Sequence, residues 1–149
     1  MKKIFLTAIT VLSGLVTMSQ TKLDNQTPEQ KLNEQFCSGL FKSAEGTIID
    51  MEQNPSAIAY LNILDWLDSR VTGLRVYKTR NGTRIPYIRG EVPGIYIDEQ
   101  QVEASYLNAL SISDIAMIKV IKSSFMGGSG SNSAIAIYTY IDTSNCSSE

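Results

Sequence analysis

The chain has 149 residues, of which 43% are hydrophobic and 19% are charged, a composition that predicts one globular domain. Its formal net charge is −2 and it contains no histidine. The acidic balance argues against a general nucleic-acid binder, and the lack of histidine excludes Ser-His-Asp and Cys-His catalysis.

Residues 1–19 have the pattern of a signal peptide. A lysine pair precedes an apolar run, 4–16, that is too short to span a bilayer comfortably, and Thr17 and Ser19 then stand at the −3 and −1 positions of a cleavage site. The alternative is a buried N-terminal helix. We expect an exported chain, in the periplasm or associated with the outer membrane, with no transmembrane span once the signal peptide is removed.

Two helices are predicted next. In the N-terminal segment 20–54, apolar residues spaced by four predict a short amphipathic helix over 28–42, with Thr27 as N-cap and Pro28 at the first position. A longer helix is expected from Asn54 to Arg70, through "SAIAYLNILDWLDSR". Its predicted apolar face contains Ile58, Leu61, Leu64, Trp66 and Leu67.

Short strands follow the second helix. The β-branched and aromatic stretches are 46–51, 74–78, 85–90, 94–103, 115–123 and 134–140, and the stretch 94–103 is expected to fold back on itself. Interleaved helices and strands predict an α+β fold with a mixed sheet of four to five short strands and two to three helices.

The loop "SSFMGGSGSNS" raises the possibility of a phosphate site. A phosphate-binding loop needs a lysine before Ser or Thr and a helix after it, whereas a strand pattern follows Ser133 here. The loop is therefore interpreted as a connection between two strands, with Phe125 and Met126 packed beneath it. No cofactor is expected.

Enzymatic chemistry has little support in the sequence. Lys119 and Lys122 stand near Ser123, but nothing in their strand indicates an apolar pocket that would lower a lysine pKa. A metal site has little support as well, because the sequence contains no histidine and no closely spaced cysteines. We expect no catalytic and no metal residues, and keep a small envelope hydrolase with an unrecognised site as the alternative.

The two cysteines, Cys37 and Cys146, lie near the two ends of the exported chain. In an oxidising compartment they could close a disulfide, which would stabilise the fold by about 4–5 kcal/mol in the chain-entropy model. Two free thiols are the alternative.

Charged residues are segregated along the chain. Six basic residues and no acidic one lie between Arg70 and Arg89, and five acidic residues and no basic one lie between Glu91 and Asp114. One interpretation is charge pairing between neighbouring strands. The other is a cationic edge that contacts an anionic partner or a surface glycan.

Residues 55–141 resemble the plug domain of TonB-dependent outer-membrane receptors, most closely the plug-like modules of Bacteroidetes. The blocks keep the family's order: "VTGLRV", "IRG", "PGIYID", "DIAMIKVIK", "FMGG" and "AIAIYT". Three positions depart from the pattern: Glu99 replaces a glycine, and Met117 and Lys119 replace an acidic pattern. The resemblance implies the plug fold.

A receptor's plug lies inside a barrel of many strands, but only nine residues follow Tyr140. We therefore expect a stand-alone plug-like module, with 142–149 as a tail. The resemblance implies a binding role through protein or ligand contacts, an outer-membrane barrel or envelope protein as partner, and an association with TonB-dependent uptake. A receptor remnant without a task is a further alternative.

Exposed loops would carry recognition on such a scaffold. The candidate residues are Arg80, Asn81, Gly82, Arg84, Pro93, Gly94, Gly127, Gly128, Ser129 and Gly130. Connection alone is the alternative role for each loop.

Overall fold

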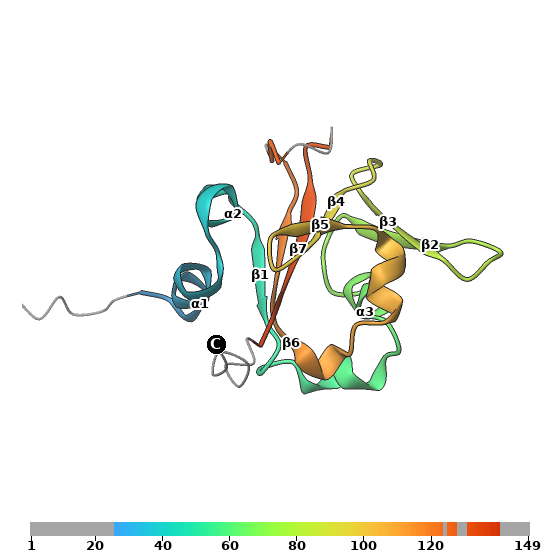
Figure 1. Cartoon of the computed structure of the whole chain (residues 1–149), viewed down its shortest axis with the longest axis horizontal. Coiled ribbons are helices and arrows are strands. Elements are labelled where there is room, and N and C mark those ends of the chain that lie inside the picture. The colour runs from blue at the N-terminus through green and yellow to red at the C-terminus, as the bar shows by residue number, and fades with distance from the viewer. Residues whose placement is uncertain (1–25, 124, 128–130, 141–149) are drawn as a thin grey trace, which may run out of the picture.

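A five-stranded mixed sheet separates two layers of helices in this computed structural model (Figure 1), which describes residues 26–123, 125–127 and 131–140. The sheet has the order β1-β6-β7-β4-β5, and a separate two-stranded ribbon contains β2 and β3. The strands are β1 (Thr47–Asp50), β2 (Leu74–Lys78), β3 (Arg84–Ile88), β4 (Gly94–Ile97), β5 (Gln100–Val102), β6 (Ile115–Ile121) and β7 (Ala134–Thr139). The α+β class expected from the sequence is confirmed.

The strands β6 and β7 form the centre of the sheet. β6 pairs antiparallel with both β1 and β7, whereas β4 runs parallel to β7. β4 and β5 form the expected hairpin, whose turn residues Asp98 and Glu99 both adopt positive φ, 46° and 66°. Each strand lies within a stretch that the sequence predicted, except that β3 begins one residue before the predicted stretch 85–90.

The two faces of the sheet carry different side chains. Isoleucines such as Ile118 and Ile137 belong to the core shared with the third helix and the ribbon. Small and aromatic residues, such as Ala136 and Tyr138, belong to a second core under the N-terminal helices. Because both faces are covered, β6 and β7 are apolar nearly throughout, as buried central strands are.

The N-terminal helix is interrupted. α1 (Pro28–Phe36) begins with the predicted cap, since Thr27 and Gln30 form a capping box. It ends at Phe36, with Cys37 as its C-cap, and a second short helix, α2 (Gly39–Ser43), follows in place of the single helix predicted over 28–42. Phe41 is the buried residue of α2, and it packs against Tyr96 and Phe125 with ring centroids 5.0 and 4.9 Å apart.

The prediction of one long helix over 54–70 is wrong. A 3₁₀ helix spans Pro55–Ala59, and α3 spans only Ile63–Leu67, after Asn62 in extended conformation. The Asn62 side chain, 1% exposed, caps α3 by accepting from the Leu64 N–H at 2.9 Å. It also donates to Asn108 Oδ1 at 2.9 Å, so a tertiary contact fixes the break in the helix.

The break reverses the exposure of the first half of the predicted helix face. Ile58 is 65% exposed and Leu61 is 91% exposed, whereas Leu64, Trp66 and Leu67 are buried as expected. Asn54 does not cap with its side chain but donates to the Asp50 carbonyl.

Two further 3₁₀ helices, Ala104–Asn108 and Ile112–Asp114, connect β5 to β6. Ala104–Asn108 packs near β3 and contributes Leu107, which is fully buried in the core shared with α3. Within the ranges that the structure describes, none of the helices combines the length and the apolar character needed to cross a membrane.

Candidate functional site

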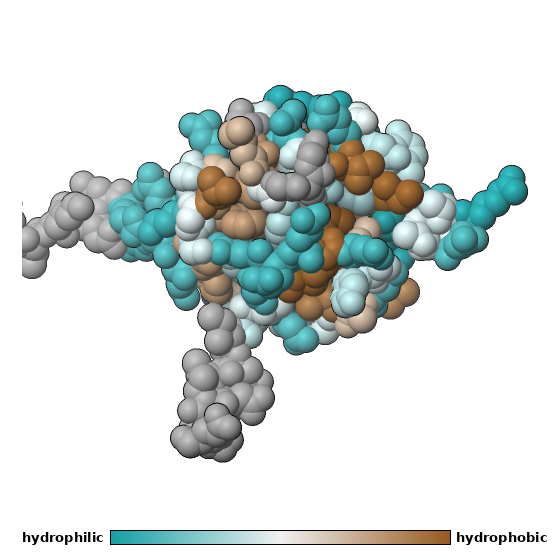
Figure 2. Space-filling model, turned by 45° about the horizontal axis from the view of Figure 1, so that its top comes forward, coloured by the Kyte–Doolittle hydropathy of each residue, from teal (hydrophilic) through white to brown (hydrophobic). Residues whose placement is uncertain are grey.

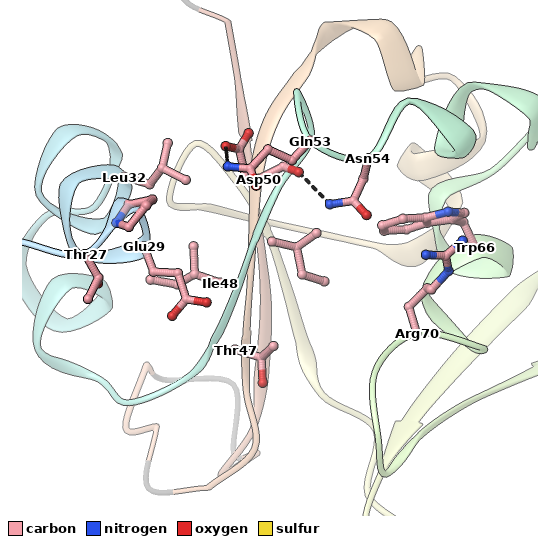
Figure 3. A pocket seen from close by; sticks show the side chains of 12 residues that line it. Thr27, Glu29, Leu32, Thr47, Ile48, Asp50, Gln53, Asn54, Trp66 and Arg70 are labelled. Atoms are coloured by element: carbon pink, nitrogen blue, oxygen red, sulfur yellow. Dashed lines mark hydrogen bonds between the residues drawn. The ribbon is translucent and has the colours of Figure 1, made fainter.

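A groove of about 570 Å³ runs along the edge strand β1, between the start of α1 and the side of α3 (Figure 3). β1 pairs with β6 through one edge, so its other edge faces the groove. The lining residues are Thr27, Pro28, Glu29, Leu32, Thr47, Ile48, Ile49, Asp50, Gln53, Asn54, Trp66 and Arg70. The groove was not anticipated, because it joins segments that are far apart in the sequence.

Some polar groups of the groove are engaged within the chain, whereas the indole Nε1 of Trp66 is buried and has no hydrogen-bond partner among the described residues. The Asp50 carboxylate accepts from the Glu52 N–H and from Gln53 Nε2 at 2.8 Å. The Arg70 guanidinium lies over the Trp66 ring, 5.1 Å from its centroid, in a cation–π contact. The groove combines apolar walls with an open strand edge.

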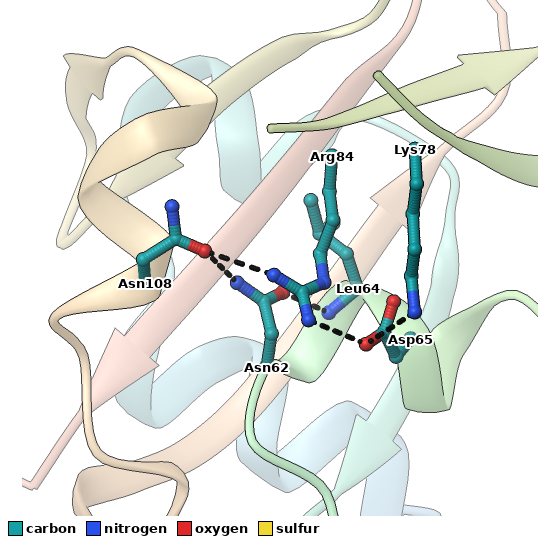
Figure 4. A network of polar contacts seen from close by, with 6 residues as sticks. All are labelled: Asn62, Leu64, Asp65, Lys78, Arg84 and Asn108. Carbon is teal, nitrogen blue, oxygen red and sulfur yellow. Dashed lines mark hydrogen bonds and ion pairs between the residues drawn. The ribbon is translucent and has the colours of Figure 1, made fainter. Parts of the chain in front are cut away.

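A polar network ties the ribbon to α3 (Figure 4). Asp65 Oδ2 lies 2.8 Å from Arg84 Nη2 and 3.2 Å from Lys78 Nζ, and Arg84 also donates to Asn108. The hydrogen bond from Arg84 holds the pKa of Asp65 below its usual value, and Asp65 raises the pKa of Arg84. The proposed pairing with the acidic stretch 91–114 is therefore wrong for these two cations: their partner is a helix residue.

Glu99 joins the hairpin turn to the N-terminal helices. Its carboxylate accepts from the Ser38 N–H at 2.6 Å and from the Ser38 hydroxyl, and the Tyr138 hydroxyl donates to it at 3.2 Å. Glu99 adopts a φ of 66°, a conformation that favours glycine. The departure from the plug pattern thus has a structural reason, because a glycine could not hold the segment between α1 and α2.

Lys119 lies in an environment that the sequence did not predict. Its side chain is 2% exposed, and its ammonium donates to Asn33 Oδ1 and to the Phe41 carbonyl, both at 2.6 Å. Burial lowers the pKa of Lys119. The apolar surroundings considered absent do exist, but the hydrogen bonds of the amine attach α1 and α2 to the sheet. The available signal was its position two residues from Met117 and Ile121 on one face of an apolar strand.

Burial also affects the neighbouring groups on this face. It raises the pKa of the Tyr138 hydroxyl and of the Cys37 thiol. Cys37 is 5% exposed, whereas Cys146 lies outside the described residues. The disulfide therefore stays a prediction. Across the part of the chain that is described, no three His, Cys, Asp or Glu side chains cluster as metal ligands.

The first predicted recognition loop lies at the tip of the ribbon. Arg80, Asn81 and Gly82 are exposed, and Gly82 has a φ of 78° in the turn closed by the Thr79 and Thr83 backbones. Arg84 belongs to the polar network instead.

The other two loops meet at one end of the sheet. Pro93 and Gly94 are buried rather than exposed, and the Gly94 N–H donates to the Ser133 carbonyl at 3.0 Å. The expectation of an accessible loop at this position is therefore wrong. The structure brings it beside the glycine-rich connection and away from the ribbon tip.

The glycine-rich connection joins β6 to β7, as expected. Phe125 is 3% exposed beneath it, whereas Met126 is 87% exposed, which corrects its expected packing. The Gly127 carbonyl accepts from the Tyr96 hydroxyl at 3.1 Å, and a Cβ there would overlap the Phe125 ring. The candidates Gly128, Ser129 and Gly130 lie outside the described residues.

No protein-family model matches the sequence, and no curated protein matches it. Solved structures do match. The chain is similar to a part of a chain in the RagAB peptide transporter, with a TM-score of 0.52 and 20% identity over 66% of this chain. Structures of the RagAB peptide importer in its "open-open" and "closed-closed" states give TM-scores of 0.53 and 0.51, with 20% and 21% identity.

The match covers 12% of the length of each of those chains. At this identity the likeness concerns the fold alone. It relates the fold of this protein to part of a transporter component, in agreement with a receptor-related architecture.

Proposed function

We propose that this protein is a non-enzymatic, plug-like binding module of a cell-envelope transport system, and that it acts through contact with another protein chain. The single observation that carries the proposal is the fold likeness to part of a chain in the RagAB peptide transporter. The plug-like sequence blocks support the same interpretation, because "PGIYID", "DIAMIKVIK" and "AIAIYT" contain the strands β4, β6 and β7, and "VTGLRV" covers the start of β2.

The chemistry of the described residues favours binding over catalysis. Three ionisable groups that could have served a reaction are used to connect layers: Lys119 and Glu99 attach the N-terminal helices, and Arg84 attaches the ribbon to α3. Each is held by hydrogen bonds within the chain, which suits a rigid scaffold that presents surfaces.

Large apolar side chains on the surface provide contact area for a partner. Leu61 is 91% exposed, Ile58 65% and Met126 87%, so each can contact a partner chain at the surface. We propose an outer-membrane transporter chain as the partner, on the periplasmic side after export, with a role in TonB-dependent uptake.

The proposal is tested by photo-crosslinking in intact cells. The full chain, with its leader, carries a benzophenone amino acid at Leu61 in one variant and at Met126 in another. Irradiation is expected to link at least one variant to an outer-membrane transporter identified by mass spectrometry, with unirradiated cells as control. Exclusive capture of cytoplasmic proteins, or no capture from either position, would overturn the proposal.

Export is tested separately on the same material. The purified protein is expected to lack residues 1–19 by intact mass and to fractionate with the envelope. Retention of the leader together with a cytoplasmic location would contradict the envelope role independently of any partner.

A further inference from the structure

The ribbon of β2 and β3 has an inner and an outer face. Alternation along β2 directs Val76 and Lys78 toward the body, where Val76 packs on the core and Lys78 pairs with Asp65. Arg75 and Tyr77 then lie on the opposite side, and the register places them across from Tyr87 and Ile85. We call Arg75, Tyr77, Ile85 and Tyr87 the outer ribbon face.

An aromatic pair occupies the middle of the outer ribbon face. Tyr77 and Tyr87 are diagonal neighbours across the two strands, with ring centroids 5.4 Å apart and planes at 81°. Tyr77 is nevertheless 62% exposed, although tyrosine carries a large apolar surface. The two rings hold each other in place and leave one side open to a ligand.

The structure divides the basic stretch into cations with and without partners. Lys78 and Arg84 pair with Asp65, and Arg70 lies over Trp66. Arg75, beside the aromatic pair, and Arg80, at the ribbon tip, are exposed and form no ion pair with a carboxylate of the described residues. Figure 2 shows the projecting end of the molecule, at the right, as hydrophilic. The ribbon therefore presents uncompensated positive charge.

We propose that the outer ribbon face, together with Arg80, binds an acidic extended segment of a partner protein. The proposal rests on the proposed function and names one contact surface for it. Guanidinium groups pair with carboxylates in a planar, bidentate geometry, and tyrosine and arginine are the residue types most often found at the centres of protein interfaces. Two arginines flanking an aromatic pair fit carboxylates separated by a short extended stretch.

An anionic membrane fits this face less well. Proteins that lie on a lipid surface bury exposed aliphatic, phenylalanine or tryptophan side chains among the acyl chains. The only aliphatic residue of the outer ribbon face, Ile85, is half-buried. Its contact area comes from tyrosines, which suit a polar protein segment.

The first test is photo-crosslinking in cells with a benzophenone amino acid at Tyr77 of the full chain. The expected product is a crosslink to a peptide rich in Asp and Glu, assigned by mass spectrometry. A crosslink to a neutral or basic segment, to a lipid or glycan, or to a second copy of this chain would overturn the inference, as would the absence of any product.

The second test uses the purified mature chain and a fluorescein-labelled decaglutamate peptide as probe, followed by anisotropy. The double variant R75E/R80E is expected to weaken binding at least tenfold. K42E/K122E, which changes the net charge equally at sites outside the ribbon, should weaken it less than twofold. Equal losses in the two double variants would show a general charge effect and overturn the inference.

A third variant tests whether the aromatic pair contributes to binding in addition to the positive charge. Tyr77→Ala keeps the charge and is expected to weaken probe binding severalfold; unchanged binding would contradict a role for the aromatic pair. Vesicles containing anionic phospholipid should not compete with the probe, and competition would overturn the inference. Crosslinks from Leu61 or Met126 without one from Tyr77 would leave the proposed function standing and remove this surface from it.

Discussion

Removal of the Asp65 carboxylate is expected to loosen the ribbon from the body of the protein. Asp65 lies on α3 and is the shared acceptor for Arg84 and Lys78 on the two strands of the ribbon. Asp65→Ala leaves the Arg84 guanidinium, whose side chain is only 18% exposed, without its counter-charge. A partly buried ion pair that loses one partner is destabilising because the remaining charge stays desolvated.

The magnitude follows from the two contacts. The Arg84 contact is 2.8 Å long between side chains 18% and 19% exposed, and a hydrogen bond between charged groups contributes about 1.5–3 kcal/mol. The Lys78 contact is 3.2 Å long with the lysine 59% exposed, and such surface pairs contribute about 0.2–1 kcal/mol. Asp65→Ala should therefore lower the free energy of unfolding at neutral pH by about 2–4 kcal/mol.

Urea unfolding followed by the fluorescence of the single tryptophan measures this loss, since Trp66 is 1% exposed in the folded state. The midpoint is expected to fall by roughly 1–2 M. A double-mutant cycle should give a coupling energy of about 1.5–3 kcal/mol for Asp65 with Arg84 and less than about 1 kcal/mol for Asp65 with Lys78. Equal couplings, or an Arg84 coupling near zero, would refute the argument from burial.

The pH dependence of the same variant has a defined sign. Arg84 lowers the pKa of Asp65 in the folded state, so the stabilisation is fully present above the unfolded-state pKa of about 3.9 and is lost as the pH falls through the folded-state value. The stability difference between the wild type and Asp65→Ala should shrink below about pH 4. A difference that stays constant into the acid range would contradict the ion-pair explanation.

Three further changes probe other parts of the structure. Glu99→Gly relieves a positive φ but removes the hydrogen bonds to Ser38, so it should destabilise by about 1–2 kcal/mol and speed amide exchange over residues 38–43; unchanged exchange would contradict this role. Burial lowers the pKa of Lys119, so the charged side chain opposes folding at lower pH, and the wild type should gain stability as the pH rises through the folded-state pKa. Lys119→Met should not show this gain, and the free energies of unfolding of the two proteins are compared up to about pH 10. Leu61→Ala should change the free energy of unfolding by less than about 0.5 kcal/mol, whereas Leu64→Ala should lower it by about 2–5 kcal/mol, as measured by urea unfolding. Comparable losses would support the continuous helix over 54–70 instead of the interrupted one.

The strands could be predicted from the sequence because their signal is local. β-branched and aromatic residues with intervening turn residues mark each strand, and the apolar character of 115–121 and 134–139 predicts two central strands. The capping box at Thr27 is local as well, since it needs only residues three positions apart.

The helix over 54–70 could not be predicted correctly, because its interruption depends on a distant partner. Nothing in the local sequence prevents Asn62 from lying in a helix. Its side-chain amide, however, donates to Asn108, 46 residues later, and its side-chain oxygen caps α3. Once the backbone is extended there, Ile58 and Leu61 no longer share a face with Leu64. Local periodicity contains no information about that contact.

The candidate site was only partly visible in the sequence. The ribbon tip at Arg80–Gly82 is exposed as expected, because a short polar turn between two strands must lie at the surface. The sequence also showed that every charged residue in 70–89 is basic. It could not separate Arg84, which is neutralised by a helix residue, from Arg75, which has no carboxylate partner among the described residues.

By itself the sequence determined the class of fold and the approximate position of each strand, because propensity, turn residues and alternation act over a few residues. Tertiary structure alone decided which side chains meet across the layers: Asp65 with Arg84, Glu99 with Ser38, and Lys119 with the Phe41 carbonyl. Those contacts depend on the paths of segments tens of residues apart, and burial of their charges is stabilised only where the folded chain supplies partners.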